Sequence, residues 1–192
     1  MNTPNKLTLL RILLVPVIVF FLLMDIPCKY LTGLTLFIIA ISTDLADGML
    51  ARKKQLVTNL GKFLDPLADK ALVSAVLICF VQLDLTNTVA VIIIVIREFL
   101  VTGIRLAATD KGVVIAAGVL GKLKTITQSV AIIIILLLQT MFSFDFRFMP
   151  EELCLMRIGD ILIWVAAALT VISGVEYFIK NRKHIFDNDA AR

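Results

Sequence analysis

Histidine and cysteine are scarce in this sequence, and their positions exclude several kinds of site. The single histidine, His184, lies in the polar C-terminal tail, so no histidine can act as a general base within the apolar part of the chain. The three cysteines, Cys28, Cys79 and Cys154, lie in or beside apolar runs without the spacing of a metal site. Because their number is odd, a disulfide framework is not expected either.

Charged residues are also few, and apolar residues form long runs. Only 18% of the chain is charged, whereas 59% is hydrophobic, and the mean hydropathy is +0.97. Several runs approach the roughly 20 apolar residues that cross a bilayer. The composition therefore predicts a polytopic membrane protein. The first run has no small-x-small cleavage site before Asp25, so we expect it to be retained rather than removed as a signal peptide.

Six hydrophobic segments follow one another along the chain, separated by short polar joints. They are roughly Leu7–Met24, Tyr30–Met49, Leu64–Val81, Thr88–Ala108, Gly118–Phe142 and Leu155–Ile179. Lysine and arginine gather at alternate joints, and the positive-inside rule then places both termini in the cytoplasm. The sequence thus predicts a single all-α integral membrane domain over residues 1–192, with six transmembrane helices. No nucleic-acid partner is expected.

Four aspartates interrupt the apolar pattern at two tight spacings. Asp44 and Asp47 are three residues apart, and Asp65 and Asp69 are four apart, so each pair shares one helix face. The short link at 53–60 makes the two helices antiparallel neighbours, which lets the acidic faces meet. Each ionised carboxylate costs roughly 2.5–3.5 kcal/mol in a bilayer core. Converging carboxylates without histidine or cysteine suit two Mg²⁺ or Mn²⁺ ions, which would neutralise the cluster and clamp a phosphoryl group.

Small residues accompany the first acidic pair. Gly48 lies four residues after Asp44 and Ala51 four after Asp47, so this face can admit a ligand close to the backbone. Asp47 precedes Arg52 by about 7–8 Å of helix rise, which places the site just below the cytoplasmic interface. A cation or proton pathway is the alternative. It predicts acidic groups nearer the midplane and paired broken helices in two repeats, and the sequence shows neither.

These residues can be written as one pattern: Asp44-x-x-Asp47-Gly48-x-x-Ala51-Arg52, eight residues, then Gly61-x-x-x-Asp65-x-x-x-Asp69. The pattern resembles the signature of the CDP-alcohol phosphatidyltransferases at every defining position. The resemblance extends to the six-span plan and so to most of the chain. It implies that CDP-diacylglycerol donates its phosphatidyl group to an alcohol and releases CMP, at a site that holds two divalent metal ions.

The resemblance also implies roles for individual residues. The four aspartates would bind the metals, and Asp69 would also take the proton from the acceptor hydroxyl. The residues around the CDP-lipid would be Asn5, Thr8, Gly48, Ala51, Arg52 and Gly61. Asn5, Thr8 and Arg11 resemble the family's amphipathic N-terminal lead-in, although interfacial anchoring is the alternative for Arg11. Members of the family are commonly homodimers, so a homodimer in a bacterial inner membrane, with its active site facing the cytoplasm, is implied here.

Cationic residues in the fourth and fifth segments indicate the acceptor. Arg97 and Arg105 are eight residues apart, about 12 Å of helix rise, so both can face one cavity. Lys122 and Lys124 follow at the start of the fifth segment. Four cations near a two-metal site suit an acceptor that carries a phosphate. The alternative is that Arg97 pairs with Glu98 or another carboxylate and that the two lysines only anchor the interface.

The runs REFLVTGIR and GKLKT resemble the branch of the family that uses sn-glycerol 3-phosphate. This implies that the 1-hydroxyl of glycerol 3-phosphate, deprotonated by Asp69, attacks the β-phosphorus of CDP-diacylglycerol, leaving phosphatidylglycerophosphate in the membrane. Inositol phosphate is the nearest alternative acceptor, whereas inositol, serine and choline lack the phosphate. Ser173 and Gly174, in the last segment, are interpreted as packing residues only.

Overall fold

The computed structural model describes the backbone of residues 3–54, 59–110, 118–144 and 152–186, and the side chains of residues 9–43, 67–68, 70–106, 108, 118–144 and 156–181. The described residues form six helices: α1 (Thr3–Leu23), α2 (Lys29–Lys54), α3 (Asn59–Gln82), α4 (Thr88–Asp110), α5 (Val119–Ser143) and α6 (Glu152–Phe186). Each predicted hydrophobic segment corresponds to one of these helices. The all-α prediction is therefore confirmed for the described residues.

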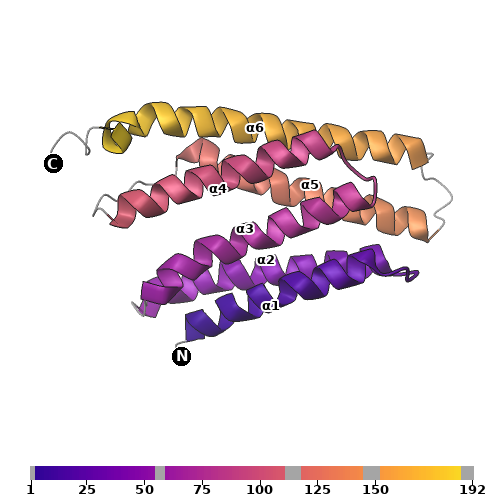
Figure 1. Ribbon diagram of the computed structural model, residues 1–192. Helices are drawn as coiled ribbons and strands as arrows, with labels where there is room; N and C mark the ends of the chain where they lie inside the picture. Colours follow the sequence, from indigo (N-terminus) through magenta and orange to yellow (C-terminus); the bar gives the residue numbers. More distant parts are fainter. Residues whose placement is uncertain (1–2, 55–58, 111–117, 145–151, 187–192) are drawn as a thin grey trace.

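The six helices lie alongside one another and alternate in direction (Figure 1). The start of α1 and the end of α6 lie at the same end of the bundle, on the left of the view. The joints between α1 and α2 and between α3 and α4 lie at the other end. Helices α4 and α6 run in the same direction. Successive contacts between them therefore follow the same order along both helices.

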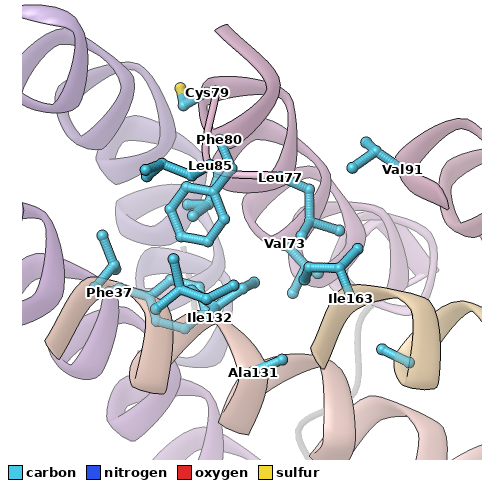
Figure 2. Packing of buried hydrophobic residues seen from close by; sticks show 14 of the residues in the cluster. Phe37, Val73, Leu77, Cys79, Phe80, Leu85, Val91, Ala131, Ile132 and Ile163 are labelled. Atoms are coloured by element: carbon cyan, nitrogen blue, oxygen red, sulfur yellow. The ribbon is translucent and has the colours of Figure 1, made fainter. Parts of the chain in front are cut away.

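The helices pack as two linked groups around a common apolar core. Helix α1 packs against α2 and α3, α6 packs against α4 and α5, and contacts of α2 with α5 and of α3 with α4 and α5 join the groups. Phe37, Leu77, Phe80, Ile132 and Ile163, which come from four helices, are fully buried and gather at the centre (Figure 2). Within a bilayer such side chains stabilise the bundle mainly through van der Waals packing, because lipid tails are as apolar as the side chains themselves.

Two glycines mark close approaches between elements. A Cβ added to Gly33 would overlap the side chain of Leu22, so α1 and α2 can meet closely only because this position carries no side chain. A Cβ added to Gly159 would lie 2.7 Å from the carbonyl oxygen of Leu85, where α6 crosses the turn between α3 and α4. Small residues at such crossings are common in membrane helices.

The outer surface of the bundle is apolar. Large hydrophobic side chains such as Leu13, Phe20, Leu100, Ile126 and Ile161 are exposed. Two stretches of the described residues, Val119–Ser143 and Met156–Asn181, are long and apolar enough to cross a membrane, and shorter apolar stretches occur in α1, α2 and α3. This surface is consistent with a membrane protein. The six spans and the cytoplasmic termini stay predictions.

Candidate active site

The four aspartates of the sequence pattern lie on two consecutive helices. Asp44 and Asp47 lie in the second half of α2, and Asp65 and Asp69 lie in the first half of α3. Both pairs fall within continuous helix, so the helical spacing on which the prediction rests is present. Figure 1 shows the end of α2 and the start of α3 at the same end of the bundle. The side chains of these aspartates are outside the described residues.

For the residues expected around the CDP-lipid, too, the structure describes the backbone but not the side chains. Asn5 and Thr8 lie at the start of α1, Gly48, Ala51 and Arg52 lie near the end of α2, and Gly61 lies at the start of α3. Their side chains are not among those described. Within the described side chains, no group of three or more histidine, cysteine, aspartate or glutamate residues could hold a metal ion. The predicted metal ligands and CDP-lipid contacts therefore stay predictions.

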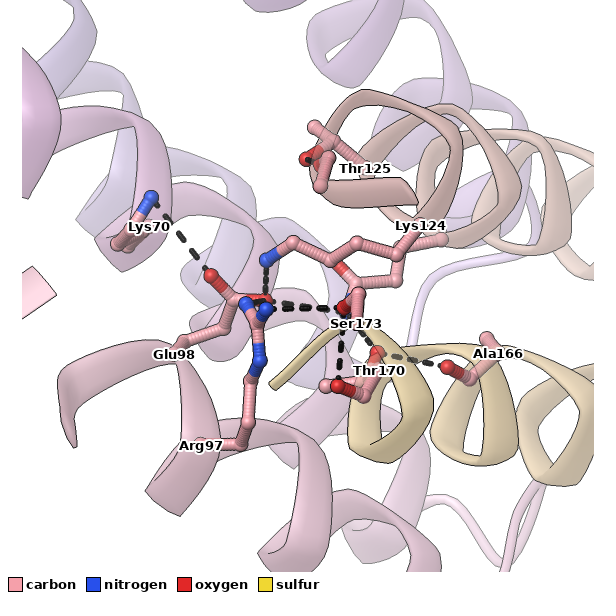
Figure 3. Close-up of polar contacts among 10 residues, drawn as sticks. Lys70, Arg97, Glu98, Lys124, Thr125, Ala166, Thr170 and Ser173 are labelled. Atoms are coloured by element: carbon pink, nitrogen blue, oxygen red, sulfur yellow. Dashed lines mark hydrogen bonds and ion pairs between the residues drawn. The ribbon is translucent and has the colours of Figure 1, made fainter. Parts of the chain in front are cut away.

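A buried ionic cluster is centred on Glu98 of α4, which is 4% exposed. Lys124 of α5, itself 5% exposed, donates a hydrogen bond to Oε1 of Glu98. Nζ of Lys70 on α3 lies 3.6 Å from Oε2, and Nη1 of Arg97 lies 3.6 Å from Oε1. Nε2 of Gln128 donates to the same Oε1 at 3.4 Å. Three helices thus bring their polar side chains to one carboxylate (Figure 3).

Helix α6 completes the cluster with two hydroxyl groups. Nη2 of Arg97 donates to Oγ of Ser173 at 2.9 Å, and that hydroxyl donates to the carbonyl oxygen of Thr170 at 3.0 Å. Nε2 of Gln128 donates to Oγ1 of Thr170 at 2.9 Å, and this hydroxyl donates to the carbonyl oxygen of Ala166 at 2.6 Å. Ser173 and Thr170 are both buried. They therefore orient Arg97 and Gln128 from α6, and Figure 3 shows Ser173 beside the guanidinium of Arg97.

The α4–α6 interface continues to Arg105. Cζ of Arg105 lies 5.5 Å from the ring centroid of Tyr177, which is within the range of a cation–π interaction. Because the two helices run in the same direction, this pair follows the pair of Arg97 and Ser173 along the interface. A Cβ added to Gly174 would lie 3.0 Å from Nε and 3.2 Å from Cγ of Arg97. Arg97 therefore occupies space that the glycine leaves.

The four cations that were predicted to hold an acceptor phosphate have different surroundings in the structure. Arg97 and Lys124 meet in the Glu98 cluster, and Arg105 lies farther along the same α4–α6 interface. Lys122 is exposed, two residues from the buried Lys124. The contact between Arg97 and Glu98 that was considered as the alternative is present. The same carboxylate is also contacted by Lys70 and Lys124.

Four members of the network are not among the site residues predicted from the sequence: Lys70, Gln128, Thr170 and Ser173. The packing interpretation of Ser173 is incomplete, because its hydroxyl is a hydrogen-bond partner of Arg97. A signal was available for Lys70, which directly follows Asp69 and begins the mostly apolar second half of α3. Thr170 and Ser173 are three residues apart and so share a helix face, but nothing in their own segment identifies a partner.

Comparisons with known proteins identify relatives over nearly the whole chain. The model of the CDP-alcohol phosphatidyltransferase family matches residues 1–172. A protein of Bacillus subtilis (strain 168) named CDP-diacylglycerol–glycerol-3-phosphate 3-phosphatidyltransferase is 47% identical over 192 residues, covering 94% of this chain and 95% of the relative. A protein of the same name from Rickettsia bellii (strain RML369-C) is 37% identical and covers 95% and 97%. One from Wigglesworthia glossinidia brevipalpis is 32% identical and covers 98% and 99%.

Proposed function

The chain belongs to the CDP-alcohol phosphatidyltransferase family, and from that premise we propose that it transfers the phosphatidyl group of CDP-diacylglycerol to sn-glycerol 3-phosphate. The products are phosphatidylglycerophosphate and CMP. The observation that carries the proposal is a junction of two charged regions. Lys70, which directly follows Asp69 of the acidic pattern, contacts Glu98 at the centre of the cationic cluster.

The charge of the cluster supports an acceptor that bears a phosphate. Lys70, Arg97 and Lys124 all contact Glu98, so lysine and arginine donors from three helices gather at one place. A phosphate monoester carries nearly two negative charges near neutral pH, and its oxygens accept the strong hydrogen bonds that arginine and lysine donate. Glycerol 3-phosphate supplies such a group, whereas serine or choline does not.

We propose that the acidic pattern holds two divalent cations, Mg²⁺ or Mn²⁺, through Asp44, Asp47, Asp65 and Asp69. Their carboxylate oxygens are the ligands that these hard cations prefer. When bound, the cations would neutralise charge on the phosphoryl oxygens. Asp69 accepts the proton of the 1-hydroxyl of glycerol 3-phosphate. That oxygen forms a bond to the β-phosphorus of CDP-diacylglycerol, and the bond from this phosphorus to the oxygen of CMP breaks.

The CDP-lipid is proposed to bind at the same end of the bundle. The residues involved are Asn5, Thr8, Gly48, Ala51, Arg52 and Gly61. Their support is positional, because the start of α1, the end of α2 and the start of α3 all lie at that end (Figure 1). We further propose one domain with six spans in the inner membrane, an active site that faces the cytoplasm, and a homodimer as the working form.

The reaction is tested by CMP release from CDP-diacylglycerol by the purified full-length protein, with and without glycerol 3-phosphate. We expect release only with the acceptor, and loss of release in Asp69→Asn. Asp25→Asn is the matched control, because Asp25 is exposed in the joint between α1 and α2. Release of CMP without any acceptor alcohol would show that the protein is a hydrolase and not a transferase. Ion flux in liposomes without CMP release would assign the aspartates to a transport pathway.

An acceptor panel tests the choice of alcohol. Inositol phosphate would satisfy the same cationic cluster, so it is the alternative within the family. We expect turnover with glycerol 3-phosphate, as the names of the relatives state for those proteins, and little with glycerol, inositol or serine. Efficient turnover of a phosphate-free alcohol would contradict the proposal.

A further inference from the structure

A buried hydroxyl lies in the α4–α6 interface without a described role. Tyr177 is 7% exposed, and its OH is among the buried polar atoms that have no hydrogen-bond partner within the described part of the chain. Nε of Arg97 is another buried polar atom without a hydrogen-bond partner in this part of the chain. Buried polar groups in native proteins are nearly always hydrogen-bonded, so an exception calls for an explanation. Two such atoms in one interface indicate a place where a polar ligand can be received.

The surroundings of Tyr177 identify the chemistry of that ligand. Its ring packs against the guanidinium of Arg105. Ser173 lies one helical turn earlier on the same face of α6 and accepts a hydrogen bond from Arg97. The hydroxyl therefore lies in an interface that carries two arginines. A phenol can donate one hydrogen bond, and in an interface that carries two cationic groups the favoured acceptor is an anionic oxygen.

We propose that Tyr177 is a further acceptor-binding residue, whose hydroxyl donates a hydrogen bond to the phosphate of the acceptor alcohol. This rests on the proposed function, because the phosphate is that of glycerol 3-phosphate. The two parts of the side chain act separately: the ring positions Arg105, and the hydroxyl binds the phosphate. The hydroxyl adds a directional donor to the charge of the arginines, and so favours a phosphate-bearing alcohol over a neutral one.

The variant Tyr177→Phe separates the two parts, because it removes the hydroxyl and keeps the ring. We expect the KM for glycerol 3-phosphate to rise about tenfold, the effect of losing one hydrogen bond to a charged group. The KM for CDP-diacylglycerol should stay within about twofold, and the thermal unfolding midpoint of the purified protein should not fall, because the hydroxyl has no described partner to lose. Tyr30→Phe is the matched control, since Tyr30, the other tyrosine of the chain, lies at the start of α2.

The outcomes separate this proposal from the proposed function. An unchanged KM for glycerol 3-phosphate in Tyr177→Phe overturns the role of the hydroxyl. A lower unfolding midpoint with both KM values raised also overturns it, because the hydroxyl would then be structural. In either case the wild-type protein still makes phosphatidylglycerophosphate. If the wild-type protein does not make it from glycerol 3-phosphate, the proposed function itself fails.

Discussion

Lys124 of α5 donates a hydrogen bond to Glu98 of α4 inside the bundle, across 26 positions of sequence. Lysine and glutamate are seldom buried unless they are paired, and here each is at least 95% buried. The pair also draws in Lys70 of α3 and Arg97 of α4. The carboxylate of Glu98 is therefore in contact with cationic side chains from three helices, α3, α4 and α5.

Glu98→Gln should destabilise the protein. The amide keeps the shape of the side chain but removes the negative charge that Lys70, Arg97 and Lys124 share. Breaking a buried ion pair costs on the order of 3 kcal/mol. Thermal unfolding in detergent measures the effect. Glu176→Gln on α6 is the control, because its contact with Lys180 is largely exposed and should change the midpoint little. Equal midpoints for both variants would contradict this.

Lys124→Met and Lys122→Met should differ sharply although the positions are two apart. Lys124 is buried against Glu98, whereas Lys122 is exposed. We expect Lys124→Met to raise the KM for glycerol 3-phosphate about tenfold or more, as the loss of one charge-assisted hydrogen bond implies. Lys122→Met should raise it less, because solvent screens an exposed charge. Steady-state kinetics measure the KM for glycerol 3-phosphate in both variants. A larger rise in Lys122→Met than in Lys124→Met would contradict this prediction.

Gly174→Ala should disturb Arg97. The added methyl carbon would lie 3.0 Å from Nε and 3.2 Å from Cγ of Arg97, so the arginine must move and its bond to Ser173 is weakened. We expect a severalfold rise in the KM for glycerol 3-phosphate with little change for CDP-diacylglycerol.

Gly103→Ala on α4 is the matched control for that substitution. A Cβ at Gly103 would have no heavy atom within 4 Å among the described residues. Alanine is a better helix former than glycine by roughly 0.5–1 kcal/mol, so this variant should be as stable as the wild type or more so. If the two variants have the same KM for glycerol 3-phosphate, the prediction that a methyl group at position 174 displaces Arg97 is contradicted.

Removal of divalent cations should abolish transfer. EDTA should stop CMP release, and excess Mg²⁺ or Mn²⁺ should restore it, because four carboxylates are proposed to bind the ions. Asp44→Asn should raise the cation concentration that gives half-maximal activity, since one anionic ligand is lost. A titration of activity against free Mg²⁺ measures both effects. Full activity in EDTA would remove the metals from the proposed function.

The number and order of the helices could be predicted from the sequence, because long apolar runs between polar joints leave few alternatives. The ends of the helices were predicted less well. Helix α6 ends at Phe186, seven residues beyond the predicted Ile179, and α2 continues to Lys54, past the predicted Met49. Hydropathy reports the apolar length of a segment, whereas a helix can continue into polar sequence. In α6, the contact of Lys180 with Glu176 one turn earlier supports such a continuation.

The acidic pattern could also be found without a structure, because its residues are close in sequence and helical periodicity relates them. The cationic cluster could be found only in part. Arg97 and Ser173 are 76 positions apart, and only the packing of α4 on α6 brings them together. Lys122 and Lys124 look alike in the sequence. Residues two apart point to different sides of a helix, and the packing of α5 buries Lys124 while Lys122 stays exposed.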